Sequence, residues 1–270
     1  MTIKFGLIGG GVMGEALLSR LIARDIYQPS EVIVSEPLPT RQSYLRDKYD
    51  VTVTTDNGVV FTEASEVVFL AIKPQVFSAI AQELADILTI QISPLVISIL
   101  AGVSLSQLES AFPQLPVIRA MPNTPATVGA GVTAMCLGAY TNPKHQKTAH
   151  QVFSAVGEVV EVPEMLMDAV TGLSGSGPAY VALMVESLAD GGVAAGLPRG
   201  IANKLALQTV LGTAKLLQDN KIHPAELKDR VTSPGGTTIA GIAQLERAGF
   251  RSALIEAVKA ATVRSQELGK

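Results

Sequence analysis

A glycine-rich loop near the amino terminus constrains the fold more than any other feature of the sequence. An apolar run at residues 3–8 leads directly into Gly9-Gly10-Gly11-Val12-Met13-Gly14, and apolar residues then recur at helical spacing over residues 16–22. Between a strand and a helix, such glycines permit a tight turn, close approach of the backbone to a pyrophosphate, and close packing of helix against strand. The amides at the start of the helix then point at the phosphates. We therefore expect these six residues to bind a dinucleotide.

Short apolar runs and helical patterns alternate up to Pro163. Strands are predicted at residues 32–34, 67–72, 95–100, 117–119, 132–137 and 159–162, and helices at residues 41–49 and 76–88. This alternation is typical of a parallel sheet covered by helices on both faces. Beyond Pro163 only helices are predicted, at residues 180–195, 199–217, 224–230, 238–247 and 251–267. The sequence thus predicts an α/β fold, with a Rossmann-like parallel-sheet dinucleotide-binding domain at residues 1–163 and an all-helical substrate-binding and dimerisation domain at residues 164–270.

The helices predicted in the second domain are apolar around most of their circumference, above all between residues 179 and 217. A small helical domain has too little interior to bury them all, so we expect a second subunit to cover them. The stretch is not a membrane span, because Glu186, Asp190 and Arg199 interrupt it before the ~18 apolar residues that a span requires.

Charge and cysteine content narrow the class of partner. The net charge is −3, so the chain lacks the basic surface typical of proteins that bind nucleic acid or anionic membranes, and a small-molecule substrate is expected. Cys136 is the only cysteine, and the first residues show no export signal; both features favour the cytoplasm. His145, His150 and His223 do not combine with carboxylates at metal-ligand spacing, so we expect no metal.

Residues after the second predicted strand bear on the choice of cofactor. Glu36 lies roughly 20 residues beyond the glycine loop, where a carboxylate binds the adenosine ribose hydroxyls and disfavours a 2′-phosphate. This position favours NADH, although Glu36 could equally be a solvated turn residue. Ser35 could donate to a phosphate and Arg41 could reach one, so both NADPH and NADH remain open.

Six longer stretches match those of a known family. They are residues 5–14, 71–75, 98–102, 119–125, 171–180 (TGLSGSGPAY) and 227–238 (LKDRVTSPGGTT), and the last two are the most specific. Together they span the chain and resemble pyrroline-5-carboxylate reductases, which catalyse the last step of proline biosynthesis. Arg230 departs from the family pattern, in which a smaller polar residue stands there, and this leaves a cofactor contact at that position open.

The resemblance implies an N-terminal Rossmann-like domain, a helical domain that interlocks with that of a second subunit, and often a ring of dimers. Carried over to this sequence, Asn57 resembles an adenosine contact. The loops that would hold the pyrophosphate and nicotinamide contain Ala71, Ile72, Lys73, Pro74, Ala101 and Gly102. These residues lie at the carboxyl ends of predicted strands, where ligands of open parallel sheets collect. Lys73 could equally be a solvated lysine.

The segment Ser233-Pro234-Gly235-Gly236-Thr237-Thr238 is suited to binding an anion. Its glycines let the backbone curl, and amides at the following helix start would point at a carboxylate, although the segment could also be a plain helix cap. By resemblance, the substrate is a cyclic imine with a carboxylate. Thr238 would then hydrogen-bond near the substrate nitrogen, while the amides of Gly236 and Thr237 bind the carboxylate. Glu164 resembles a substrate-facing position, where a carboxylate favours the iminium form; alone it would be a helix-start acid.

Two other functions share the glycine loop. A 3-hydroxyacid-type dehydrogenase needs a general base beside the hydroxyl, usually a lysine with an asparagine one helical turn later. Here Lys204 is followed by Gln208, and Lys215 by Asp219, so this pair is absent. A non-catalytic dinucleotide-sensing module would have no need of the second anion site at residues 233–238.

Overall fold

The structure, a computed structural model, describes residues 2–85, 87 and 93–269. It divides into two compact units. The first comprises Met1–Gly175 together with Ala261–Lys270, and the second comprises Ser176–Ala260. Residue 88, where the helix predicted at residues 76–88 was to end, lies outside the described residues.

The first unit is built on an eight-stranded sheet with the order β3-β2-β1-β4-β5-β6-β7-β8. The strands are β1 (Phe5–Ile8), β2 (Val32–Ser35), β3 (Thr52–Thr54), β4 (Val67–Leu70), β5 (Leu95–Ser98), β6 (Val117–Met121), β7 (Gly131–Leu137) and β8 (Gly157–Glu161). All neighbouring strands are parallel except β6 and β7, which are antiparallel. The parallel sheet predicted from the sequence is therefore confirmed for every neighbouring pair except β6 and β7, whose antiparallel pairing was not predicted.

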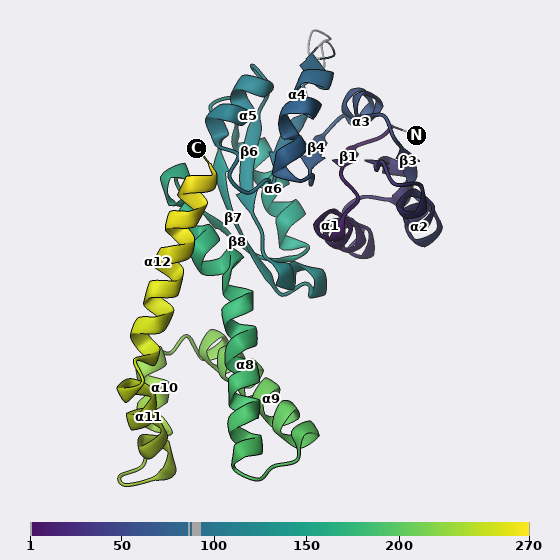
Figure 1. The fold of residues 1–270 in the computed structure, drawn as a ribbon. Coiled ribbons are helices and arrows are strands. Elements are labelled where there is room, and N and C mark those ends of the chain that lie inside the picture. Colours follow the sequence, from purple (N-terminus) through teal and green to yellow (C-terminus); the bar gives the residue numbers. More distant parts are fainter. Residues whose placement is uncertain (1, 86, 88–92, 270) are drawn as a thin grey trace. The chain divides into compact units, whose positions relative to one another are not determined.

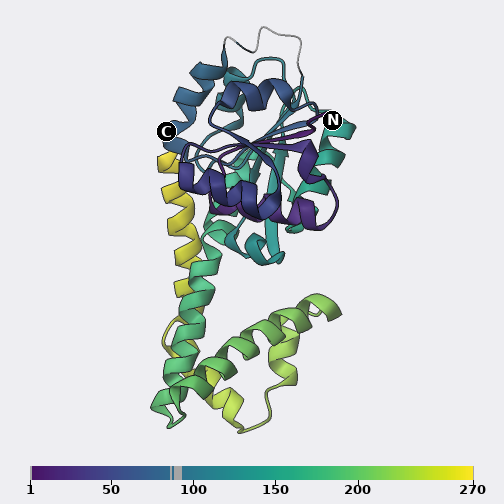
Figure 2. The same cartoon turned by 90° about the vertical axis from the view of Figure 1, so that its right-hand side faces the viewer.

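Helices cover both faces of this sheet (Figures 1 and 2). One face carries α1 (Val12–Ala23), α2 (Pro39–Tyr49) and α6 (Pro143–Ser154), and the other carries α3 (Asn57–Glu63), α4 (Phe77–Ala85) and α5 (Leu105–Ala111). Alternate residues of one strand point to opposite faces. In β4, for example, Phe69 packs with the first group of helices and Val68 with the second. Burial on both faces explains why the central strands are continuously apolar.

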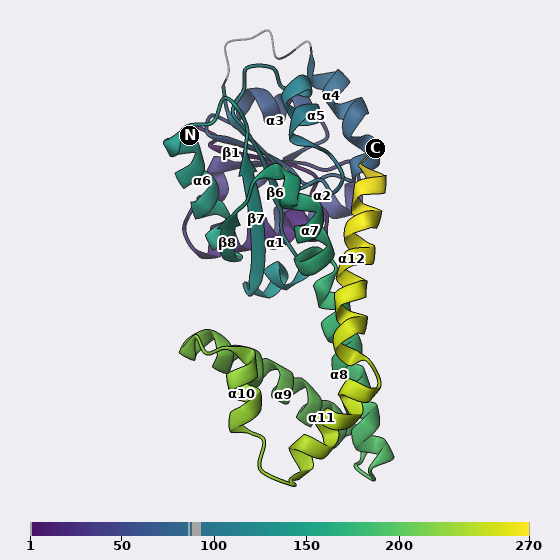
Figure 3. The ribbon, with the colours of Figure 1, turned by 90° about the vertical axis from the view of Figure 1, so that its left-hand side faces the viewer.

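The first unit is completed by two segments that follow the sheet. A short helix, α7 (Met167–Val170), continues as a π-helical turn at Thr171–Gly175, and Met167 packs on Ala134 and Cys136 of β7. The last turns of α12 (Phe250–Leu268) lie beside α7 (Figure 3). There the Ser265 hydroxyl donates a hydrogen bond to Asp168 Oδ1 at 2.7 Å.

The regular secondary structure of the second unit is entirely helical. It contains α8 (Gly177–Ala194), α9 (Arg199–Asn220), α10 (Pro224–Arg230), α11 (Thr237–Arg247) and the first part of α12. Small residues let α8 pack closely on α9, because a Cβ on Gly192 would lie only 3.2 Å from the Ala202 Cβ. Many large apolar side chains of α8 and α9 remain exposed in the single chain, including Leu183 at 64% and Leu207 at 59%. Within the described residues, no helix is both long and apolar enough to cross a membrane.

Candidate active site

The loops predicted to bind the cofactor follow adjacent parallel strands and meet at one edge of the sheet. Hydrogen bonds continue from the strands into these loops: the Gly9 amide donates to the Ser35 carbonyl at 2.9 Å, and the Ala71 amide donates to the Ile8 carbonyl at 2.8 Å. The structure thus places the glycine loop between the ends of β2 and β4. Because β1 lies at the point where the strand order reverses, this edge is the usual ligand position of such sheets.

The three glycines of the motif have different surroundings. Gly9 has a φ of +104°, and a Cβ there would lie 2.6 Å from the Ala71 carbonyl oxygen. A Cβ on Gly14 would lie 2.2 Å from the Gly9 carbonyl oxygen, so only glycine lets α1 pack this closely on β1. At Gly11, by contrast, nothing lies within 4 Å of a Cβ position. Gly9 and Gly14 are therefore required by the fold itself, whereas Gly11 faces open space.

The start of α1 presents backbone amides to that open space. Gly11 is the N-cap and has no side chain with which to cap the helix, and the Val12 side chain that follows is 76% exposed. The first amides of a helix have no intrahelical acceptor and carry partial positive charge. The arrangement is therefore suited to binding a phosphate group.

Glu36 lies beside the glycine loop and is only 6% exposed. Its carboxylate accepts hydrogen bonds from the Gly10 amide at 3.1 Å and from the Leu38 amide at 3.0 Å. These bonds tie the end of β2 to the loop. They also hold a negative charge at the point where the chain leaves the sheet.

Glu15, on α1, gathers a cluster of donors around its carboxylate. Arg41 forms an ion pair with it and also donates from Nε to the Gly10 carbonyl at 2.7 Å. Tyr44, Lys48 and Tyr49 donate to Glu15 Oε1. Burial alone would raise the pKa of the Glu15 carboxyl, but these hydrogen bonds outweigh it and lower the pKa to about 2. Arg41 is thereby fixed against the glycine loop.

Ser35 and Asn57 form a second polar link at this edge. The buried Ser35 hydroxyl donates to Asn57 Oδ1 at 2.7 Å, and Asn57 Nδ2 donates to Glu83 Oε2 at 3.0 Å. Asn57 is the first residue of α3, and Asp56 caps that helix by accepting from the Val59 amide. The structure therefore brings the predicted residues Ser35 and Asn57 into direct contact.

Loops after β4 and β5 provide the remaining predicted cofactor residues. Ala71 contacts the glycine loop, Ile72 is partly buried against the core, Lys73 is exposed, and Pro74 begins a 3₁₀ turn. We call residues 99–104 the β5 loop. The loop contains Ala101, which is exposed, and Gly102, whose φ is +76°.

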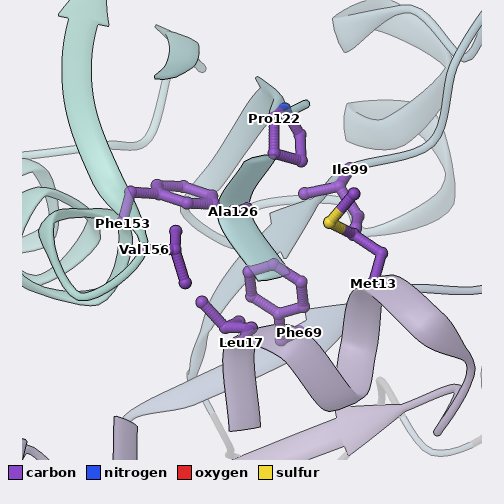
Figure 4. A pocket seen from close by; sticks show the side chains of 8 residues that line it. All are labelled: Met13, Leu17, Phe69, Ile99, Pro122, Ala126, Phe153 and Val156. Atoms are coloured by element: carbon purple, nitrogen blue, oxygen red, sulfur yellow. The ribbon is translucent and has the colours of Figure 1, made fainter. Parts of the chain in front are cut away.

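A small apolar cavity of about 10 Å³ lies close to these loops (Figure 4). Its lining includes Met13 from α1, Ile99 from the β5 loop and Pro122, which follows β6, together with Phe69 and Phe153. The space suits about one water molecule and offers it no polar partner from these side chains. The cavity is therefore packing space rather than a ligand site.

Glu164, predicted to face the substrate, is anchored at a contact that sequence reasoning missed. Its Oε1 accepts a short hydrogen bond from the Leu105 amide at the start of α5 and pairs with Arg119 Nη1 at 3.0 Å. The Arg119 side chain is 9% exposed and that of Glu164 is 35% exposed. The three residues come from distant segments, so no local pattern could have revealed the cluster. Both donors use Oε1, and the hydrogen bonds of the described residues leave Oε2 for another partner.

Burial raises the pKa of the nearby Cys136 thiol to about 11, and the negative charge of Glu164 adds to the increase. The thiol therefore stays protonated at neutral pH. A protonated, buried thiol is a poor nucleophile.

The polar turn at residues 233–238 belongs to the second unit. Gly235 has a φ of +68°, and a Cβ on Gly236 would lie 2.3 Å from the Ser233 hydroxyl. Gly236 is the N-cap of α11, which begins at Thr237, one residue earlier than predicted. Ser233, Gly235 and Thr237 are exposed, and Thr238 is partly so. Since no side chain caps α11, its first amides are available to an anion.

Other polar residues singled out from the sequence have local partners. Arg230 pairs with Glu226 one helical turn earlier at 2.6 Å, His150 lies 2.6 Å from Glu161, and His223 caps α10. Among the described residues, no group of three or more His, Cys, Asp or Glu side chains is placed to hold a metal ion.

Comparison with known proteins places this chain in a family. Residues 164–268 match the family described as pyrroline-5-carboxylate reductase dimerisation, and residues 4–102 match the family described as NADP oxidoreductase coenzyme F420-dependent. The chain is 62% identical to a pyrroline-5-carboxylate reductase of Synechocystis over the full length of both proteins. It is 47% identical to that of Methanosarcina acetivorans, over 99% of this chain and 98% of that one.

Solved structures agree with this assignment. A pyrroline-5-carboxylate reductase from Coxiella burnetii matches with a TM-score of 0.93 and 35% identity, and each chain is covered completely. The Plasmodium falciparum pyrroline carboxylate reductase, whose structure has NADP bound, matches with a TM-score of 0.88 and 30% identity over 99% of this chain and 98% of that one. The hydroxyacid dehydrogenase and sensing-module alternatives are thereby set aside. The chain belongs to the pyrroline-5-carboxylate reductase family and is an oxidoreductase that self-associates through its helical region.

Proposed function

We propose how this chain performs the reaction of its family, the reduction of 1-pyrroline-5-carboxylate to L-proline by hydride transfer from NADPH or NADH. In this scheme residues 1–163 bind the cofactor, and residues 164–270 bind the substrate and a second subunit. The observation that carries the proposal is the contrast within the glycine loop. Gly9 and Gly14 are closely packed, while Gly11 alone faces open space at an uncapped helix start.

This loop fits the pyrophosphate of a nicotinamide dinucleotide. A side chain at Gly11 would fill the space that a phosphate needs, and the amides of Val12, Met13 and Gly14 would donate to it. Gly10, Ala71, Ile72, Lys73 and Pro74 would border the phosphates, and Ala101 and Gly102 the nicotinamide. When bound, the reduced nicotinamide supplies the hydride. The protein has only to hold the nicotinamide and the substrate close together in the correct orientation.

At the adenosine end, Glu36 is proposed to set the cofactor preference. Its carboxylate is already held by two backbone amides, so its charge is fixed where the adenosine ribose would bind. That charge repels a 2′-phosphate, whereas Ser35 and Asn57 offer polar groups to the adenosine. Arg41 is engaged with Glu15 and the Gly10 carbonyl, which limits its reach toward a phosphate. These contacts support binding of NADH, whereas the match to the NADP oxidoreductase family and the relative with NADP bound support NADPH, so both cofactors are proposed.

The polar turn is proposed to bind the substrate. Amides of Gly236 and Thr237 would hold the carboxylate, and Thr238 would hydrogen-bond near the ring nitrogen, with Ser233 and Gly235 shaping the turn. A protonated imine is already electrophilic, so no strong acid is needed at the carbon that accepts the hydride. The free Oε2 of Glu164 would favour this protonated form.

The assembly and location follow from the same reasoning. The exposed apolar side chains of α8 and α9 support a dimer in which a second copy covers them. We propose that such dimers assemble further into a ring. The single cysteine supports a cytoplasmic location.

The activity is tested by mixing the purified protein with 1-pyrroline-5-carboxylate and either NADH or NADPH, and following the absorbance of the reduced cofactor. We expect substrate-dependent loss of absorbance and formation of proline. Absence of decay with both cofactors would refute the proposed reaction.

The role of Thr238 is tested with Thr238→Ala, which is expected to lower turnover while leaving cofactor affinity and the melting temperature unchanged. Thr232→Ala is the matched control, because the Thr232 hydroxyl donates to the Lys228 carbonyl within the chain. Wild-type turnover in Thr238→Ala would remove Thr238 from the catalytic site.

A further inference from the structure

The carboxyl-terminal end of α12 packs backbone to backbone against the β5 loop. A Cβ on Gly102 would lie 3.4 Å from the Leu268 carbonyl oxygen, and a Cβ on Gly269 would lie 3.3 Å from the Gly102 carbonyl oxygen. All these residues belong to the first unit. The middle of the β5 loop is therefore in contact with a segment more than a hundred residues away in the sequence.

Ser265 fixes this end of α12 in place. The residue is 7% exposed, and its hydroxyl donates to Asp168 Oδ1 on α7 at 2.7 Å. Its backbone carbonyl accepts from the Gly269 amide at 3.2 Å. Ser265 thus connects two segments. Its side chain binds α7, and its backbone carbonyl binds the turn that touches Gly102.

The two ends of the β5 loop are held independently. One end is continuous with β5, and the other is fixed where Glu164 binds the Leu105 amide. The middle of the β5 loop adjoins a pocket, which is lined by Gly102, Ser104, Arg119, Asp168, Gln266 and Gly269. Because this space adjoins Gly102, the loop has room to shift if the turn of α12 is released.

We propose that Ser265 and Asp168 are positioning residues for hydride transfer. Their hydrogen bond holds the end of α12 against Gly102 and so keeps the β5 loop, which would border the nicotinamide, in one conformation. The inference rests on the proposed function, in which Ala101 and Gly102 border the nicotinamide. Neither Ser265 nor Asp168 touches the reactants, so their effect is on geometry. A misplacement of about 1 Å between reacting groups can slow a reaction by on the order of 100-fold. The affinity for the dinucleotide, in contrast, is proposed to come mainly from the glycine loop.

The test compares Ser265→Ala and Asp168→Ala with wild type in the full-length enzyme. Turnover is expected to fall on the order of 10-fold, while the Kd of the cofactor, measured by fluorescence titration, changes by less than about 3-fold. The deuterium isotope effect on turnover, measured with cofactor labelled at the transferred position, is expected to rise because hydride transfer becomes slower. A purely structural role would lower the melting temperature without changing this isotope effect.

Two variants serve as controls. Asp168→Asn keeps an oxygen acceptor for the Ser265 hydroxyl and is expected to retain wild-type turnover. Ser252→Ala removes an exposed hydroxyl from the same helix, where it donates only to the Gly249 carbonyl, and is expected to have no effect. If one alanine variant fails to fold, the other still tests the same hydrogen bond.

Unchanged turnover and isotope effect in both alanine variants would overturn the inference. So would a loss of cofactor affinity as large as the loss of turnover, because that result would assign the pair to binding. Failure of the proposed function is distinguishable, since the wild-type enzyme itself would then fail to oxidise the reduced cofactor with 1-pyrroline-5-carboxylate.

Discussion

Replacing Gly11 or Gly14 with alanine separates cofactor binding from folding within one loop. At Gly14 the new Cβ would lie 2.2 Å from the Gly9 carbonyl oxygen, which is part of the backbone and cannot move aside cheaply. Overpacking of this kind costs about 1–3 kcal/mol or more. The better helix propensity of alanine returns at most about 1 kcal/mol. We therefore expect Gly14→Ala to destabilise the fold and lower the melting temperature by several degrees, at roughly 2–4 °C per kcal/mol.

At Gly11 the expectation is reversed. The backbone has a φ of −70°, which suits alanine, and nothing lies within 4 Å of the new Cβ. Alanine is the poorer N-cap by up to about 1 kcal/mol. A loss of about 0.4–1 kcal/mol of unfolded-state freedom offsets this difference. The melting temperature should therefore stay near that of the wild type.

Cofactor affinity should respond strongly at Gly11, because the methyl group occupies the space proposed for the pyrophosphate. Losing one hydrogen bond between an amide and a charged phosphate costs about 1.5–3 kcal/mol. Since about 1.4 kcal/mol corresponds to a factor of ten, the Kd should rise roughly 10- to 100-fold. Fluorescence titration gives the Kd, and thermal unfolding without cofactor gives the stability. Wild-type affinity in Gly11→Ala would refute the proposed pyrophosphate site.

Three further substitutions test neighbouring parts of the site. Glu15→Gln should destabilise the protein at neutral pH, because the ionised carboxylate is stabilised in the folded state, where its pKa is lowered to about 2. The difference in melting temperature from wild type should shrink as the pH falls below the unfolded value near 4.5, and should be lost only below pH 2. A pH-independent difference would contradict the ion-pair assignment. Glu36→Gln should raise kcat/KM for NADPH relative to NADH roughly tenfold, or by about 1.4 kcal/mol, through loss of like-charge repulsion, and an unchanged ratio would exclude Glu36 from cofactor choice. Glu164→Gln should lower turnover most at high pH, where the iminium is scarce, whereas a uniform loss across the pH profile would indicate that Glu164 only anchors α5.

Hydrophobic patterning was sufficient to predict the layered architecture of the first unit and the helices of the second. Central strands such as β4 and β5 are buried on both faces and therefore form continuous apolar runs. The short strand β3 was missed because its residues are exposed or only partly buried and leave no such run. Patterning also cannot distinguish parallel from antiparallel neighbours, since both leave the same apolar run, and so the reversal between β6 and β7 was not predicted.

The candidate site likewise contains features that the sequence predicts and features that it does not. The glycine loop was predictable because its residues are adjacent in the sequence and each has a defined backbone role. The capping box at the start of α5, Ser104 with Gln107, also has a local signature, and could have revealed that helix. The link between Glu164 and Arg119 and that between Asp168 and Ser265 join residues far apart in the sequence. Only the three-dimensional fold brings such pairs together.

The proposed reaction depends above all on where the substrate carboxylate binds. A crystal structure of the oligomer with NADH or NADPH and a proline analogue measures this directly. We predict that the carboxylate accepts hydrogen bonds from the amides of Gly236 and Thr237, and that the analogue ring stacks on the nicotinamide. A carboxylate bound elsewhere, with the turn at residues 233–238 remote from every nicotinamide of the assembly, would contradict the assignment.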